Sequence, residues 1–255
     1  MSSSVLCIAH PGHELRVLQW LREVRPVVLI LTDGSGSSKT SRLEASRALV
    51  TEAGGTVGRI FGRFPDRGLY EIIRNQDLKA VIGLADDLLA TLEENNADVI
   101  AGDMLEGFNT GHDLCRMLIQ ATVSRYDRRR GQPVKNFEIV LERLSATMAE
   151  RKPAVTLQLG KEGIASKRAC VEHRFPQLVE EMDRAVAKYG DVVVATEALF
   201  EAAAGLDDRW TESEPPYYET FGRKQVMAGL YTEVITHETH MQPLAQALQK
   251  WAAQA

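Results

Sequence analysis

The chain has 255 residues, of which 44% are hydrophobic and 25% are charged, and its formal net charge at pH 7 is -5. These are ordinary values for a globular protein, and the length is ample to bury a core. The acidic balance argues against a nucleic-acid-binding protein, which would carry a basic stripe. One dense basic run is present, 128–130, and we interpret it as a solvated loop after a helix.

Neither a membrane span nor a secretory signal is expected from the sequence. No apolar run approaches the length that crosses a bilayer, and the N-terminus lacks a basic segment followed by an apolar one. Cys7, Cys115 and Cys170 are too few and too far apart for a disulfide framework, which agrees with a reducing compartment. We therefore expect a cytoplasmic protein.

Strand and helix patterns alternate along the first half of the chain. Residues 4–9 and 27–31 are apolar runs typical of strands that are buried on both faces, and residues 15–24 between them have helical spacing. This predicts a right-handed βαβ unit. Further strands are expected at 56–61, 97–101, 137–144, 153–159 and 191–196, and further helices at 42–53, 76–95, 161–175 and 178–188, with another that follows 106–116 and ends near 123.

The alternation predicts an α/β fold, Rossmann-like, with a mostly parallel sheet and helices on both faces. No linker or internal repeat divides the chain, so we expect a single domain over 1–255, with 205–255 as a C-terminal extension packing on it. Two interpretations stay open for the aromatic and Pro-rich segment 214–219: a cover over the site, or a contact between copies in a homo-oligomer.

Two histidines, His10 and His13, follow the first predicted strand. Ligands of open α/β sheets bind outside the carboxyl ends of the strands, so this turn points into the usual site. Imidazole is a good zinc ligand, and catalytic zinc takes three protein ligands and leaves one position open. Side chains three residues apart can reach one ion. The alternative is a pair of surface histidines near a turn.

A second cluster, His112, Asp113 and Cys115, lies near the start of the helix that follows 97–101. In a parallel sheet this segment meets the first cluster at the same edge. A helix N-terminus or a metal stabilises a thiolate, so Cys115 is a candidate third metal ligand. The alternative for Cys115 is a small core residue, and for Asp113 it is a helix cap.

Two other patterns are considered as ligand-binding motifs: a Gly- and Ser-rich segment and a second pair of histidines. Residues 32–40 are rich in Gly and Ser, but Ser38 stands where a P-loop needs glycine, so we expect a flexible loop near the substrate. A nucleotide-dependent kinase is the alternative, and it predicts binding of ATP and Mg²⁺. His237 and His240 form another HxxH pair, for which we favour a surface or packing role because the segment does not form an HExxH motif.

On these motifs the chain resembles the LmbE-like, or PIG-L, family of metal-dependent N-deacetylases. The first strand of that family ends in AHPDDE, and residues 9–14 of this chain read AHPGHE. The segment 32–34 resembles the family's Thr-x-Gly, and residues 112–115 resemble its late HxxH-type turn. The resemblance covers roughly residues 4–125.

The resemblance implies roles for particular residues. His10 and His13 would be zinc ligands, with His13 in place of the family's aspartate, and Cys115 would take the place of the last histidine ligand. His112 would stabilise the tetrahedral intermediate. Gly12 stands where the family has its general base. Glu14 is the nearest carboxylate that could substitute for that base.

We therefore expect a zinc-dependent amidohydrolase that removes an N-acyl group, typically acetyl, from an amino-sugar-like substrate, although another divalent metal would also suit the site. His112, Glu14 and Asp113 are the candidate catalytic residues, and Arg42 is a candidate substrate-binding residue. The alternative is a binding or regulatory module that keeps the metal or ligand but performs no hydrolysis. The missing carboxylate at Gly12 favours that alternative. On the sequence alone, Gly12→Asp is expected to raise hydrolysis if Glu14 is not already the base.

Overall fold

The computed structural model describes residues 3–36, 39–142, 144–203 and 214–254. Within them a sheet of seven strands has the order β3-β2-β1-β4-β5-β7-β6. The strands are β1 (Ser4–Ile8), β2 (Val27–Thr32), β3 (Thr56–Phe64), β4 (Val99–Asp103), β5 (Lys135–Ile139), β6 (Val155–Gln158) and β7 (Thr196–Glu201). The pairs from β3 through β5 are parallel, and β7 is antiparallel to both β5 and β6.

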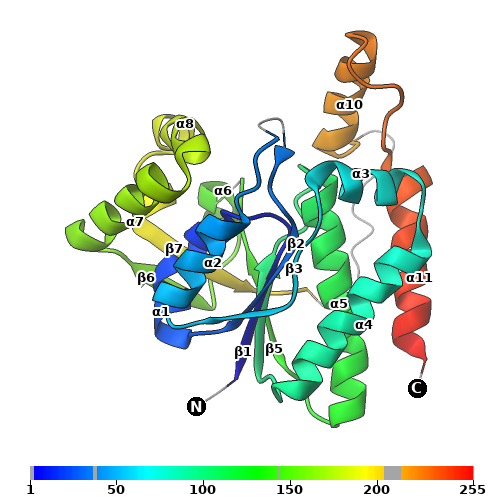
Figure 1. Ribbon diagram of the computed structural model, residues 1–255, viewed down its shortest axis with the longest axis horizontal. Coiled ribbons are helices and arrows are strands. Elements are labelled where there is room, and N and C mark those ends of the chain that lie inside the picture. The colour runs from blue at the N-terminus through cyan, green and yellow to red at the C-terminus, as the bar shows by residue number, and fades with distance from the viewer. Residues whose placement is uncertain (1–2, 37–38, 143, 204–213, 255) are drawn as a thin grey trace.

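Helices cover both faces of this sheet (Figure 1). Helices α1 (Leu18–Val24) and α2 (Leu43–Glu52) lie on one face, and α4 (Leu78–Glu94), α5 (Thr110–Arg130) and α11 (Gln242–Ala253) lie on the other. The prediction of an α/β fold with a mostly parallel sheet is confirmed. In the part of the chain that the structure describes, no helix is both long and apolar enough to cross a bilayer.

The central strand β1 explains this layering. Its alternate residues serve two cores: Val5 and Cys7 pack with α4 and α5, whereas Leu6 and Ile8 pack with α1. All four side chains are fully buried. A strand covered on both faces needs apolar residues at every position, which is the pattern that the sequence shows.

The C-terminal helix α11 joins the main core. Leu248 and Trp251 belong to the same buried cluster as residues of α4 and α5. The Trp251 indole donates a hydrogen bond to Asp86 at 3.0 Å, and the Arg125 guanidinium lies 4.6 Å from the Trp251 ring centroid. The remaining helical elements are η1 (His13–Val17), α3 (Asp66–Arg74), α6 (Leu144–Glu150), α7 (Lys161–Arg174), η3 (Pro176–Leu178), α8 (Val179–Tyr189), α9 (Val192–Ala195), α10 (Tyr217–Met227) and η4 (His237–Met241).

Two segments differ from the sequence-based expectation. The predicted strand at 191–196 was wrong: residues 192–195 form the short helix α9, and the strand begins only at Thr196. Three successive valines favour a strand locally, but the N–H of Ala195 bonds the carbonyl of Asp191 at 2.8 Å and closes a helical turn. Helix α3 lies between the predicted strand at 56–61 and the predicted helix at 76–95, where the sequence predicts no helix or strand.

The strand order reverses beside β1. The chain continues from β1 to β2 on one side, and it later enters β4 on the other side. In open α/β sheets this switch point opens a crevice at the carboxyl ends of the strands, where ligands bind. The segments that begin at His10, Thr32 and Asp103 all meet at that edge.

Candidate metal and active site

Three imidazoles converge at the switch point. The ring centroids of His10 and His13 lie 5.3 Å apart, those of His10 and His112 lie 5.2 Å apart, and those of His13 and His112 lie 4.6 Å apart. His10 and His13 follow β1, and His112 lies in the first turn of α5. The structure therefore brings His112 of the second cluster beside the two histidines of the first.

Two polar groups hold the His10 ring on one side. Its Nδ1 lies 2.7 Å from the Thr32 hydroxyl and 3.0 Å from a carboxylate oxygen of Asp66. The Nε2 atom on the other side of the ring is buried and has no hydrogen-bond partner in the described residues. Although burial opposes it, the hydrogen bonds from His10 and Thr32 keep the pKa of Asp66 well below its usual range. Asp66 is therefore a carboxylate that fixes the ring.

His13 has a similar partner on β4. Its Nδ1 lies 3.0 Å from both carboxylate oxygens of Asp103. Asp103 is fully buried and also accepts a hydrogen bond from the backbone N–H of Ala9 at 2.8 Å. Burial alone would lower the pKa of His13, but the charge and the hydrogen bond of Asp103 raise it. The contact engages Nδ1 of His13, and the residue also lines the cavity beside the site.

The start of helix α5 positions His112. Asn109 caps the helix by accepting from the N–H of Gly111 at 2.7 Å. A Cβ on Gly111 would lie 3.1 Å from Nε2 of His10, so glycine leaves room for that ring. His112 is buried, and its Nδ1 has no partner in the described residues. Burial, followed by the charges of His13 and His10, lowers the pKa of His112 well below its usual value, which favours neutral imidazole.

These residues suit zinc in their chemistry, although their donor atoms are not gathered around one point. In the described ranges, no group of three or more His, Cys, Asp or Glu side chains is positioned to hold a metal ion. Three imidazoles that share one zinc at about 2 Å have ring centroids roughly 5 Å apart, and these three rings have that spacing. Carboxylates behind His10 and His13 match the partners that metal-bound histidines usually have.

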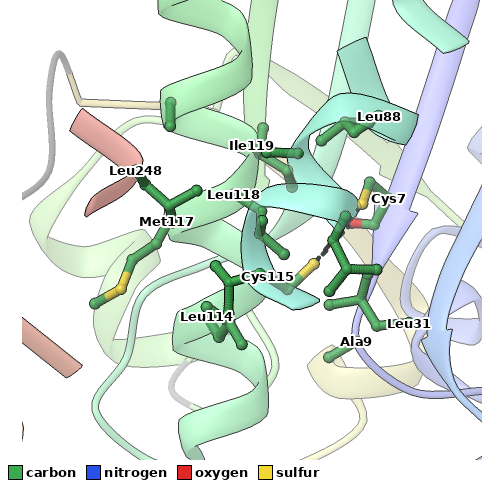
Figure 2. Close-up of a cluster of buried hydrophobic side chains, with 14 of the residues drawn as sticks. Cys7, Ala9, Leu31, Leu88, Leu114, Cys115, Met117, Leu118, Ile119 and Leu248 are labelled. Carbon is green, nitrogen blue, oxygen red and sulfur yellow. Dashed lines mark hydrogen bonds between the residues drawn. The ribbon is translucent and has the colours of Figure 1, made fainter. Parts of the chain in front are cut away.

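Cys115 does not join the three imidazoles. It is fully buried in the core, with its Sγ atom 3.9 Å from Sγ of Cys7 and 3.6 Å from the Cys7 carbonyl oxygen (Figure 2). Burial and the neighbouring thiol raise the pKa of Cys115 well above its usual value, which disfavours a thiolate ligand. One helical turn beyond His112, the side chain packs under β1 among leucines. The expected set of two histidines and a cysteine is therefore not what the structure assembles.

Glu14 and Asp113, the other candidate catalytic residues, bind backbone and hydroxyl groups. Glu14 is fully buried, accepts from the N–H of Gly12 at 2.7 Å and contacts the Ser46 hydroxyl. Burial raises the pKa of Glu14. Asp113 accepts from the N–H groups of residues 106 and 107 at 3.2 and 3.1 Å. Neither side chain lines the cavity around the histidines, so both have positions suited to shaping the turns.

A cavity of about 1190 Å³ opens beside the three histidines. Arg42 lines it and donates from Nε to the Pro11 carbonyl at 3.0 Å, so the predicted substrate-binding residue is at the site. Asp66, Glu142 and Glu181 supply carboxylates to its wall. Burial raises the pKa of Glu142. Helices α3 and α10 stand on one side of this edge and α8 on the other (Figure 1).

Sequence reasoning missed Asp66 and Asp103 as site residues. Asp103 is the last residue of a strand that was predicted to end at this edge, and Asp66 begins α3 just after β3. A carboxylate at the carboxyl end of a parallel strand was the available signal. In the other HxxH pair, Nδ1 of His240 accepts from the N–H of Thr236 at 3.0 Å. The Gly and Ser loop is described only in part, since residues 37–38 lie outside the described ranges.

Comparison with known proteins bears on the fold. No protein-family model matches the chain, and no curated protein matches its sequence. The structure of A40926 pseudoaglycone deacetylase Dbv21 aligns over 80% of this chain and 98% of its own, with a TM-score of 0.53 and 15% identity. Conserved protein TT1542 from Thermus thermophilus aligns over 83% and 100%, with a TM-score of 0.51 and 19% identity. This chain has the fold of these two proteins. It is the fold that the resemblance to the LmbE-like deacetylases implied.

Proposed function

We propose that the chain is a metal-dependent amidohydrolase that removes an N-acyl group from an amino-sugar-like substrate. One observation carries the proposal: three imidazoles meet at the switch point, and two of them are backed by the carboxylates of Asp66 and Asp103. The structural likeness to a protein described as a deacetylase supports the reaction class. The sequence motif that resembles the LmbE-like family supports the same class.

His10, His13 and His112 would hold the metal, for which zinc is the first choice. When bound, zinc supplies a Lewis acid for an amide carbonyl and lowers the pKa of water. Asp103 would keep the Nδ1 proton on His13, and Asp66 would do so for His10, which would leave Nε2 of each ring as the metal-binding nitrogen. This assignment gives His112 the place that the sequence had suggested for Cys115.

Proton transfer needs a carboxylate other than the one missing at Gly12. Glu142 follows β5, lines the cavity and has a pKa raised by burial. A group of that kind can take a proton from water and return it to the leaving amine. We assign this role to Glu142 and expect Glu142→Gln to lower kcat by about 10²- to 10⁴-fold, with metal content unchanged.

Arg42 would position the substrate. Its Nε is fixed on the Pro11 carbonyl, and the side chain lines the cavity beside the histidine turn. A guanidinium so placed can donate to hydroxyl or anionic groups. Arg42→Ala is expected to raise KM more than it lowers kcat, because the interaction concerns binding of the substrate in its ground state.

Acetate release tests the proposed reaction directly. Zinc-loaded protein is incubated with methyl N-acetyl-β-D-glucosaminide and with a simple N-acetylated amine, and free acetate is measured. Turnover that is lost with His10→Ala and kept with Cys115→Ala supports the proposal. Stoichiometric zinc without acetate release from either compound would contradict it.

A second candidate function, a binding module without hydrolysis, is favoured by one observation. A Cβ on Gly12 would lie 2.5 Å from Cδ1 of Leu178, so an apolar side chain lies against the position where the resembling family carries its base. If Glu142 does not substitute, the site would still bind metal and ligand. Saturable binding of the N-acetylated probe without acetate release, in wild type and in Glu142→Gln alike, would favour this function.

A further inference from the structure

A row of five aromatic rings, here called the aromatic platform, lines the cavity that contains the histidines. Neighbouring rings along the row have centroids 4.9 to 6.5 Å apart. The first pair is nearly parallel, with an interplanar angle of 4°. In spatial order the platform consists of Phe108, Tyr217, Phe221, Tyr231 and Tyr70.

The platform is open to solvent despite its internal stacking. The exposed fraction is 38% for Phe108, 49% for Tyr217, 39% for Phe221 and 41% for Tyr231. Leu230, which lines the same cavity, is 70% exposed. A contiguous exposed apolar surface of this kind marks a binding site more often than a chance arrangement. Aromatic rings offer such a site large apolar contact area and favourable stacking.

The rings come from separate parts of the chain. Tyr70 lies on α3, Phe108 precedes α5, and Tyr217 and Phe221 lie on α10, which stands above the body of the molecule in Figure 1. The backbone N–H of Tyr218 bonds the carbonyl of Gly107 at 3.2 Å, which joins the first turn of α10 to the segment before α5. The row is therefore formed by tertiary contacts between distant segments, as binding sites commonly are.

The platform begins next to the candidate reaction centre, so its position indicates which part of a substrate it would contact. Phe108 lies directly before the cap of the helix that carries His112, so the row starts beside the candidate reaction centre and leads away from it. The cavity volume of about 1190 Å³ exceeds the roughly 300–1,000 Å³ usual for a drug-sized ligand. The cavity thus has room for a substrate that extends well beyond one amide-bearing sugar.

The charges beside the platform are paired. Arg67 bonds Glu71 at 3.0 Å, and Arg74 bonds Glu233 at 3.1 Å. All four side chains line the cavity near the ring of Tyr70. Cations that already have carboxylate partners give little attraction to an anionic group, so this wall favours an uncharged ring system.

We propose that the aromatic platform binds a neutral aryl group attached to the amide-bearing part of the substrate. The substrate class is then an N-acylated amine, such as an N-acyl amino sugar, that carries an aromatic ring on the far side of the amide. The inference rests on the proposed function for the identity of the reacting group, but the platform's preference for a ring can be measured without turnover.

The test compares two probes that share the same N-acetylated sugar: 4-nitrophenyl N-acetyl-β-D-glucosaminide and methyl N-acetyl-β-D-glucosaminide. Isothermal titration calorimetry with the full chain gives Kd for each probe. The aryl probe is expected to bind about tenfold tighter, as one or two stacking contacts produce. In the variant Tyr217→Ala with Phe221→Ala, the ratio of the two Kd values should fall to near one, while Kd of the methyl probe stays unchanged.

Tyr189 supplies a matched control, because it is an aromatic residue of the same cavity but lies on α8, across from the platform. Tyr189→Ala should keep the aryl preference. Equal Kd values in wild type, no detectable binding of either probe at millimolar concentration, or an unchanged ratio in the double variant would each overturn the proposal. Circular dichroism of each variant establishes that α10 and the rest of the fold are retained.

Other occupants of the platform give different results. If the platform bound a second copy of the chain, light scattering would give the molar mass of a dimer for wild type and a lower molar mass for the double variant. If it bound a lipid surface, wild type would co-sediment with phosphatidylcholine vesicles and the double variant would not. Either result, without an aryl preference, overturns the proposal. An aryl preference without acetate release would reject the proposed hydrolysis but support aryl binding by the platform. Acetate release with equal Kd values would support the hydrolysis but reject aryl binding by the platform.

Discussion

His13 and Asp103 are 90 positions apart in the chain, yet Nδ1 of the imidazole lies 3.0 Å from both oxygens of the carboxylate. The same carboxylate accepts from the N–H of Ala9, so it joins the end of β4 to the turn that follows β1. One buried side chain thus fixes both the backbone path and the ring orientation. The metal-binding capacity of the site should depend on it.

Asp103→Asn is expected to weaken zinc binding by about 10- to 100-fold, because a neutral amide is a poorer partner for the Nδ1 proton of His13. The fold should persist, since the amide oxygen can still accept from Ala9. Competition with a chromophoric chelator measures the affinity. Asp113→Asn is the matched control: it alters another buried carboxylate at this edge and should leave zinc affinity unchanged. Equal effects of the two variants would contradict the assignment.

Cys115→Ala should leave zinc content intact, because the thiol lies in the core beside Cys7. We expect a loss of about 1 kcal/mol in the free energy of unfolding, as is usual for removing one buried atom. A thiol reagent should modify Cys170, which is partly exposed, before Cys7 or Cys115 in the native protein. If Cys115→Ala lost its zinc while its circular dichroism spectrum stayed unchanged, Cys115 would have to be reassigned as a metal ligand.

The same thiol should make the free energy of unfolding fall at alkaline pH. Burial holds the pKa of Cys115 above its ordinary value of 9.0, so the unfolded chain loses this proton first as pH rises. The contribution to stability is complete below pH 9.0 and is lost as pH rises toward the folded-state pKa. Between pH 8 and 10, the free energy of unfolding measured with urea should decline less steeply for Cys115→Ala than for wild type. Identical slopes would count against a strongly raised pKa.

Glu14→Gln should keep the fold and the activity. Glu14 accepts from the N–H of Gly12 and from the hydroxyl of Ser46. Glutamine can still accept from Gly12 through its oxygen, and its amide N–H can donate to the Ser46 oxygen in place of the second bond. Burial raises the pKa of Glu14 above 4.5, so its contribution to stability is present below pH 4.5 and is lost as pH rises through the folded-state pKa. The variant should lack this decline in unfolding experiments from pH 4.5 to 8. Loss of turnover in a stable variant would instead make Glu14 the base.

Gly12→Asp is now expected to destabilise the protein, in contrast to the gain in hydrolysis anticipated from sequence. Gly12 has φ of +109°, which L-residues rarely adopt, and a Cβ there would lie 2.5 Å from Cδ1 of Leu178. The strain should cost about 1–3 kcal/mol in thermal or urea unfolding. Adding Leu178→Ala should recover part of it by removing the clash. Gly83→Ala, in an open helical position, is the control and should be neutral or stabilising.

The sequence predicted the fold and the convergence of His10, His13 and His112, because apolar runs that alternate with helical patterns put the carboxyl ends of parallel strands at one edge. It could not predict the place of Cys115. A position three residues after His112 is compatible with either the site or the core, and only packing under β1 decides between them.

The other site features depend on contacts between distant segments. Asp66 begins α3, in a stretch for which the sequence predicts neither a helix nor a strand. The aromatic platform joins rings from α3, the segment before α5 and α10, and no spacing within one segment indicates it. The valines before β7 show the reverse case, in which a strong local preference for strand gives way to a helical turn closed by the surrounding structure.

The central claim is that His10, His13 and His112 share one cation. Zinc-loaded crystals measured for anomalous scattering at the zinc edge test it directly. We expect a single strong peak about 2.0–2.1 Å from one nitrogen of each of these three imidazoles. A peak beside Cys115, or no peak within reach of the three rings, would contradict the account.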